Sequence, residues 1–148
     1  MRPNAGAMTF IALALLFLFP AMAKAATLTL TVTEIPQAGT LNIGIFDTAE
    51  GFEAKERGGA TRRPGLVEGI RHAVEGSAAR LTIELPEGRY AIKLFLDLNG
   101  NGEVDTNFLG IPKEPYGFSN NAKGTLGPPS FDAAAFTIEG PRDLSIAL

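Results

Sequence analysis

The feature that most limits the fold is a series of short apolar runs that alternate with polar residues and end at turn sequences. Residues 27–33 alternate leucine or valine with threonine, and residues 41–46 and 79–85 repeat the period of two. Such alternation is typical of strands with one buried face. Residues 89–96 are apolar at nearly every position, which predicts a central strand buried on both faces.

A weaker strand pattern occurs at residues 66–74, residues 134–138 and 144–148 are predicted as the last two strands, and residues 49–57 could form a short helix. Turn sequences such as Pro86-Glu87-Gly88 separate these runs. The sequence therefore predicts an all-β fold, an antiparallel β-sandwich of about seven strands, immunoglobulin-like or transthyretin-like, with one long ordered loop.

The first 25 residues have the three parts of a secretory signal peptide. Arg2 is basic, residues 9–19 are apolar and end at Pro20, and Ala23-Lys24-Ala25 offers small residues for cleavage. The apolar stretch is shorter than the ~20 residues of a spanning helix. We expect cleavage near Ala25, a single β-sandwich domain at residues 26–148 without a membrane span, and a periplasmic or secreted location.

Composition narrows the chemistry and the partners. The absence of cysteine excludes disulfides, cysteine zinc sites and thiol catalysis. The leader contains two basic residues and no acidic one, so its removal changes the formal net charge from −3 to −5. Because phosphate backbones are bound through Lys and Arg, we expect no nucleic-acid partner. An unknown envelope protein or a small ligand is the expected partner.

An oxygen-rich loop follows the central strand. Its two glycines let the backbone curl, so that its side-chain oxygens can converge as a hard cation requires. The spacing matches the first half of a calcium loop, but Phe108 stands where the closing acid of an EF-hand would be. The candidate metal residues are Asp97, Asn99, Asn101, Glu103 and Asp105.

Two interpretations of this loop stay open. A weak calcium site would need a further ligand from elsewhere, such as Glu114 or Asp132, and its dissociation constant would be about 10⁻⁴ to 10⁻³ M. Alternatively, the loop is a metal-free turn, because Asn-Gly is a strong turn signal and Asx side chains bond to their own backbone. The sequence indicates no cofactor other than this calcium ion.

Residues 106–131 form a long Gly-, Pro- and aromatic-rich segment with neither a helix nor a strand pattern. Its many apolar side chains argue against disorder, so we expect an ordered loop packed across one end of the sandwich. Its aromatic residues would serve either as core or as an exposed platform for a ligand. The candidate ligand-binding residues are Glu114, Tyr116, Phe118, Ser119 and Asn120.

The same segment resembles a known bacterial family. The run from Asp97 to Asn121, with Asp105-Thr106-Asn107-Phe108, Gly110-Ile111-Pro112-Lys113-Glu114 and Tyr116-Gly117-Phe118-Ser119-Asn120-Asn121, is similar to the signature of domain-of-unknown-function family 2141. Residues 127–132 and 85–91 resemble its other blocks. The resemblance implies a small exported protein of the periplasm, and it implies no activity and no catalytic residues.

The function expected from these observations is that of an exported, non-enzymatic binding or accessory module. The alternative is a hydrolase that uses carboxylates of the same loop on an envelope or sugar substrate. A serine hydrolase is disfavoured because the chain has no Gly-x-Ser-x-Gly turn.

Overall fold

The computed structural model describes residues 24–55 and 63–148. The predicted signal peptide therefore lies almost entirely outside the described residues. Eight strands and three short helical segments follow one another in the described part. They are β1 (Ala25–Thr33), β2 (Gly39–Phe46), α1 (Ala49–Glu53), β3 (Leu66–Val74), β4 (Ala79–Pro86), β5 (Gly88–Asp97), β6 (Tyr116–Phe118), η1 (Ser119–Asn121), α2 (Phe131–Ala134), β7 (Phe136–Ile138) and β8 (Arg142–Ala147).

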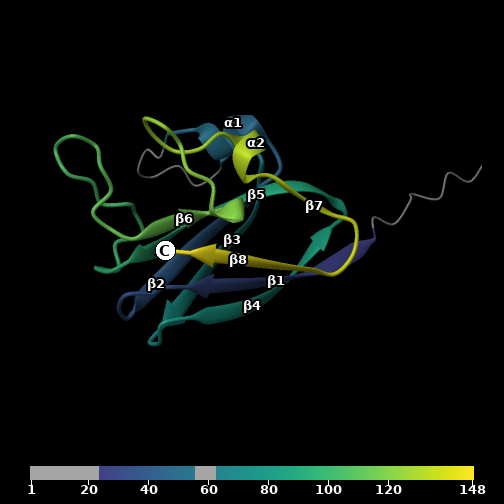
Figure 1. Ribbon diagram of the computed structural model, residues 1–148, viewed down its shortest axis with the longest axis horizontal. Coiled ribbons are helices and arrows are strands. Elements are labelled where there is room, and N and C mark those ends of the chain that lie inside the picture. Colours follow the sequence, from purple (N-terminus) through teal and green to yellow (C-terminus); the bar gives the residue numbers. More distant parts are fainter. Residues whose placement is uncertain (1–23, 56–62) are drawn as a thin grey trace, which may run out of the picture.

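These strands form two sheets that pack face to face, which confirms the predicted all-β sandwich (Figure 1). The smaller sheet has the order β4-β1-β8, and the larger one has the order β3-β2-β5-β6, with β7 paired to the start of β5. β5 lies between β2 and β6, as its apolar sequence predicts. The inward-facing residues of both sheets make the main core.

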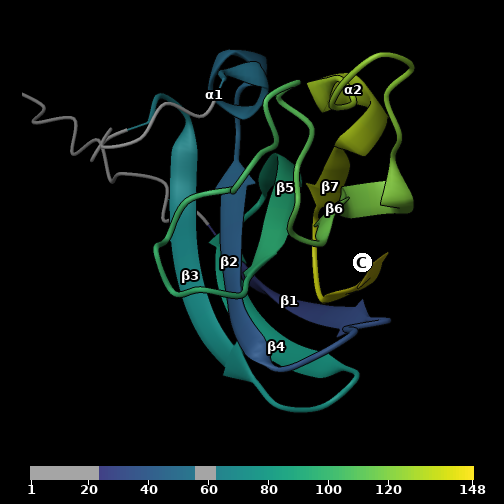
Figure 2. The same ribbon diagram turned by 90° about the vertical axis from the view of Figure 1, so that its left-hand side faces the viewer.

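A second, smaller core lies under the two helices at one end of the sandwich (Figure 2). The ring of Phe52, from α1, makes edge contacts with the rings of Phe46, Phe118 and Phe131 at about 6 Å. The carboxylate of Glu53 accepts a hydrogen bond from the backbone N–H of Phe131 at 2.8 Å. This cluster ties the C-terminal half of the long segment to the sandwich.

The structure differs from the sequence predictions near the C-terminus. Ala134, predicted as the start of a strand, is the last residue of α2, because the Ser130 hydroxyl caps this helix by accepting the Ala133 N–H; the strand β7 begins at Phe136. β8 pairs with β1 in parallel, whereas an antiparallel arrangement was predicted. β7 and β8 belong to different sheets, so the turn at residues 139–141 crosses between the sheets and does not close a hairpin.

The long segment is also more structured than predicted. It contains β6 and η1, which pair with or pack against β5 and β8. Three residues make too short a run for period-two alternation to reveal β6. The packing prediction was right for Phe131, which is buried, but wrong for Phe108 and Leu126, which are 95% and 101% exposed.

Candidate functional site

The loop from Asp97 to Asp105 begins where β5 ends, and it is built around the Asp97 carboxylate. This side chain is buried, with 2% of the residue exposed. Its two oxygens accept the backbone N–H groups of Gly100 at 2.7 Å and Gly102 at 2.8 Å. Both glycines have φ of +77°, a left-handed conformation that residues with a Cβ rarely adopt. The two Asn-Gly pairs therefore curl the chain around Asp97.

Two asparagines complete the turn. The side-chain oxygen of Asn99 accepts the Asn101 N–H at 3.1 Å, and that of Asn101 accepts the Glu103 N–H at 2.9 Å. Their side-chain amides donate to the two carboxylate oxygens of Asp105, at 2.5 Å from Asn99 and 3.1 Å from Asn101. Three of the five candidate metal residues thus meet at the Asp105 carboxylate, while the Glu103 residue is exposed.

Glu114 closes the loop from outside it. Only 5% of this residue is exposed. One carboxylate oxygen accepts the Leu98 N–H at 2.9 Å, and the other accepts the Asp105 N–H at 3.1 Å. The beginning and the end of the loop are therefore held by one side chain.

Asp132, the other acid considered as a distant ligand, does not reach the loop. It lies in α2, where its carboxylate pairs with the guanidinium of Arg89 at 2.8 Å. Glu114 is therefore the acid that the fold brings to the loop.

The electrostatics of the loop favour an ionised Asp97. Burial alone would raise the pKa of Asp97, but hydrogen bonds from the backbone N–H groups of Gly102, Gly100 and Asn99 act in the opposite direction, and the pKa is lowered overall. The guanidinium of Arg71, from β3, lies 3.8 Å from the Asp97 carboxylate and lowers the pKa as well. The same positive charge offsets part of the negative charge that would attract a cation.

The loop offers amide and carbonyl oxygens more readily than clustered carboxylates. Among residues 24–55 and 63–148, no three His, Asp or Glu side chains converge closely enough to hold a metal ion. A cation would therefore need the side-chain oxygens of Asn99 and Asn101 and the carbonyl oxygen of Glu103 in addition to Asp97 and Asp105. Such neutral oxygens are accepted by calcium, and a low ligand charge makes its binding weak.

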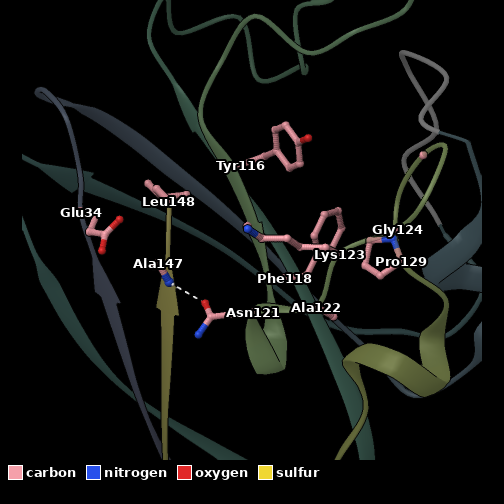
Figure 3. Close-up of a pocket in the computed structure, with 12 residues that line it drawn as sticks. Glu34, Tyr116, Phe118, Asn121, Ala122, Lys123, Gly124, Pro129, Ala147 and Leu148 are labelled. Carbon is pink, nitrogen blue, oxygen red and sulfur yellow. Dashed lines mark hydrogen bonds between the residues drawn. The ribbon is translucent and has the colours of Figure 1, made fainter.

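The five candidate ligand-binding residues fall into three places. Glu114 belongs to the loop described above. Tyr116 and Phe118 line an open groove of about 510 Å³ between β6, the end of β8 and residues 122–129 (Figure 3). Tyr116 is 49% exposed. The ammonium of Lys123 and the carboxylate of Glu34 supply the charges of this groove.

Ser119 and Asn120 are not among the residues that line the groove, and they act as anchors. The Ser119 hydroxyl is fully buried, accepts the Ile92 N–H at 2.8 Å and donates to the Ala134 carbonyl at 2.5 Å. The Asn120 side-chain amide donates to the Ala135 carbonyl at 2.8 Å. Both residues therefore attach the segment to β5 and to the chain around α2.

Sequence reasoning missed part of the groove. Glu34, Lys123, Pro129 and Leu148 come from three separate stretches of the chain, and no spacing rule connects them. A close approach holds β6 near β8: a Cβ on Gly117 would lie 2.8 Å from the Cγ2 atom of Ile146. The glycine is the only local signal of this contact.

The two sheets define a small all-β sandwich protein, in which a long segment between β5 and β7 covers one end. Residues 30–145 match the model of a family described as "Uncharacterized protein conserved in bacteria (DUF2141)", and the chain belongs to this family. No curated protein and no solved structure matches the chain. None of the helices in the described part of the chain is long and apolar enough to cross a membrane.

Proposed function

We propose that the protein is an exported, non-enzymatic binding or accessory module whose recognition end is the segment from Asp97 to Phe131. The observation that supports this most directly is the closure of the Asp97–Asp105 loop by the buried Glu114 carboxylate. Residues 98–115, between β5 and β6, contain no helix or strand, and long loops of this kind in a compact domain are usually functional when they are ordered. The predicted signal peptide supports export, and the expected ligand is a small molecule or an envelope protein.

The use of the carboxylates supports a role other than catalysis. A glycoside hydrolase needs two carboxyl groups that face each other across a cleft, about 5 to 9.5 Å apart. Here Asp97 accepts backbone N–H groups that include those of Gly100 and Gly102, Glu114 accepts two backbone N–H groups, and Asp105 accepts two side-chain amides. These bonds engage the carboxylates in the loop itself, which counts against the hydrolase.

We propose further that the loop binds calcium weakly and that the ion fixes the shape of the recognition end. The Asn99 and Asn101 amides would turn their oxygens toward the ion and release the Asp105 carboxylate to it. This rotation breaks the two amide donations to Asp105 and also the two bonds in which the amide oxygens accept the Asn101 and Glu103 N–H groups, and Arg71 stays close to Asp97. We therefore expect a dissociation constant of about 10⁻³ M, at the weak end of the range for extracellular modules.

The test is a thermal melt of the purified protein in EDTA and in 10 mM calcium chloride, at matched ionic strength. At a dissociation constant of about 1 mM, 10 mM calcium stabilises the folded state by about 1.4 kcal/mol. For a domain of this size the melting temperature should rise by roughly 4–8 °C.

Two variants make the melt specific. Asp105→Asn removes a charge at the centre of the loop, and we expect it to abolish the calcium-dependent shift. Asp132→Asn removes a carboxylate outside the loop and should leave the shift unchanged. Equal melting temperatures of the wild-type protein with and without calcium would refute the cation site, and the loop would then be a metal-free turn.

A further inference from the structure

The groove beside β6 follows the outer edge of this strand. In the described part of the chain, β6 is the last strand of the larger sheet, and only its edge toward β5 is paired. All three residues of β6, Tyr116, Gly117 and Phe118, line the groove. We call this groove the β6 slot. An unpaired strand edge presents backbone N–H and C=O groups that another extended chain can bond.

The register of β6 decides which backbone groups point into the slot. The Leu96 N–H donates to the Pro115 carbonyl at 2.8 Å. Hydrogen-bonded pairs alternate along antiparallel strands, so Gly117 is the next residue that bonds to β5. The N–H and C=O groups of Tyr116 and the N–H of Phe118 therefore point away from β5, toward the slot.

The slot has one wall on each face of the sheet. Residues 122–129 form the wall on the face of the Phe118 side chain, because Ala122 and Phe118 both pack against the smaller core. On the other face, a Cβ at Gly117 would lie 3.6 Å from the Cδ2 atom of Leu148, so the end of β8 forms the second wall. Figure 3 shows these two walls on opposite sides of the groove. A strand added to the sheet would lie about 4.8 Å from β6, between them.

The backbone around the slot adopts an uncommon conformation. In the described part of the chain, three residues other than glycine have a left-handed φ: Glu34 at +57°, Asn120 at +59° and Asn121 at +48°. Glu34 and Asn121 line the slot, and Asn120 is the neighbour of Asn121. Asparagine adopts this region more readily than glutamate does. Because such conformations cost free energy and gather at ligand sites, their position favours the slot as a binding site.

The two walls carry opposite charges. Lys123 belongs to the wall of residues 122–129, and Glu34, which follows β1, lies on the side of β8 (Figure 3). Both residues are exposed, and neither forms an ion pair within residues 24–55 and 63–148. A partner with an acidic side chain toward Lys123 and a basic one toward Glu34 would complement both charges.

We propose that the β6 slot binds an extended peptide segment of a partner protein, which pairs with the outer edge of β6 and adds a strand to the larger sheet. The inference rests on the proposal that the segment from Asp97 to Phe131 is the recognition end, and it names the class of ligand. The backbone groups of Tyr116 favour a peptide over a sugar or a lipid, because a peptide strand supplies matching N–H and C=O groups.

The two walls also predict the pattern of the peptide. Successive side chains of a strand point to opposite faces of the sheet. An acidic residue that faces Lys123 and a basic residue that faces Glu34 should therefore stand an odd number of positions apart. Proline should be absent between them, since it cannot donate a backbone hydrogen bond.

The test begins with random octapeptides displayed in many copies on phage, so that weak binding is retained, and selected on the purified protein in EDTA. We expect enrichment of peptides with the predicted pattern of charges. Lys123→Glu reverses the charge of one wall and should replace the preference for an acidic residue by one for a basic residue. Lys113→Glu, at an exposed position of the same segment outside the slot, is the matched control and should select the same peptides as the wild-type protein.

N-methylation of a selected peptide, one residue at a time, tests the strand pairing. A methyl group on the nitrogen that donates to the Tyr116 carbonyl removes a hydrogen bond and collides with β6, so the affinity should fall about tenfold or more. A methyl group on the next nitrogen, which points away from β6, should change the affinity by less than about threefold. Isothermal titration calorimetry measures both values.

Four results would overturn the inference: no enrichment on the wild-type protein, selection of the same peptides by Lys123→Glu, equal affinity of all N-methylated peptides, or a dimer of the protein alone that Lys123→Glu abolishes in sedimentation velocity. The last result would assign the slot to a second copy of the chain. Because the selection uses peptides in EDTA, its failure would leave the calcium-dependent melt and the proposed binding of a small molecule standing. Thermal melts of the variants verify that they are folded.

Discussion

Glu114→Ala is the perturbation that tests most directly how the recognition end is held. Glu114 accepts the Leu98 N–H at 2.9 Å and the Asp105 N–H at 3.1 Å, and it is almost fully buried. Hydrogen bonds to a charged acceptor contribute about 1.5–3 kcal/mol each. Because both bonds are only partly buried, water can reach the freed N–H groups, so we use the lower value for each. The expected loss is about 3 kcal/mol in the free energy of unfolding.

The assay is urea denaturation of the wild-type protein and the variant, combined with hydrogen exchange at the amides of residues 98 and 105. In a thermal melt of the same two proteins, a loss of about 3 kcal/mol should lower the melting temperature by roughly 10 °C or more. Exchange at the two amides should become faster by a larger factor than exchange in β5. This difference follows because the loop can open without the sheet.

Glu114→Gln gives an intermediate case. The amide keeps one oxygen as an acceptor but turns its nitrogen toward the second N–H, so about half of the loss is expected. Glu103→Gln, at an exposed position of the same loop, is the matched control and should change the free energy by less than about 0.5 kcal/mol. The reasoning is wrong if Glu114→Ala costs less than about 1 kcal/mol while both amides stay protected.

The remaining predictions concern pH. The folded state lowers the pKa of Asp97, so its contribution to stability is present above the unfolded pKa of about 4 and is lost as the pH falls through the folded value. Asp97→Asn should therefore be less stable than the wild-type protein at pH 7, and the gap should narrow on acidification in urea melts from pH 7 to 2; a constant gap would contradict this. Burial and, to a lesser extent, Asp47 raise the pKa of Tyr90, whose hydroxyl donates to the Pro86 carbonyl at 2.8 Å. The contribution of Tyr90 to stability is present below the unfolded pKa of about 10 and is lost as the pH rises through the folded value. In urea melts between pH 9 and 12, Tyr90→Phe should therefore lose less stability than the wild-type protein. An equal fall in the free energy of unfolding with pH for both proteins would contradict this.

The sequence predicted the sandwich because strand formation depends on local alternation and on turns. Residues 66–74 were predicted as a strand with the bounds that β3 has, and the central position of β5 followed from its apolar sequence. The short elements were harder to predict. β6 has three residues and α2 has four, so neither repeats its pattern often enough to be recognised in the sequence.

The candidate site was also predictable only in part from the sequence. The curled turn around Asp97 follows from two Asn-Gly pairs, and the need for an acid from outside the loop follows from Phe108 at the closing position. The choice of Glu114 over Asp132 depends on the path of residues 106–114 and on the pairing of Asp132 with Arg89. The sequence could not supply this choice, since both acids are distant from Asp97 along the chain.

The sequence by itself determined the strands, the curl of the Asp97–Asp105 loop and the family signature, because each depends on residues close together along the chain. Only the tertiary structure decided which apolar residues of the long segment are buried. Phe131 packs under α1, whereas Phe108 and Leu126 point outward. The physical reason is that burial depends on what the other sheet and the helices place over a residue, and hydrophobicity alone does not contain that information. The exposure of Phe108 and Leu126 is therefore evident only in the folded protein.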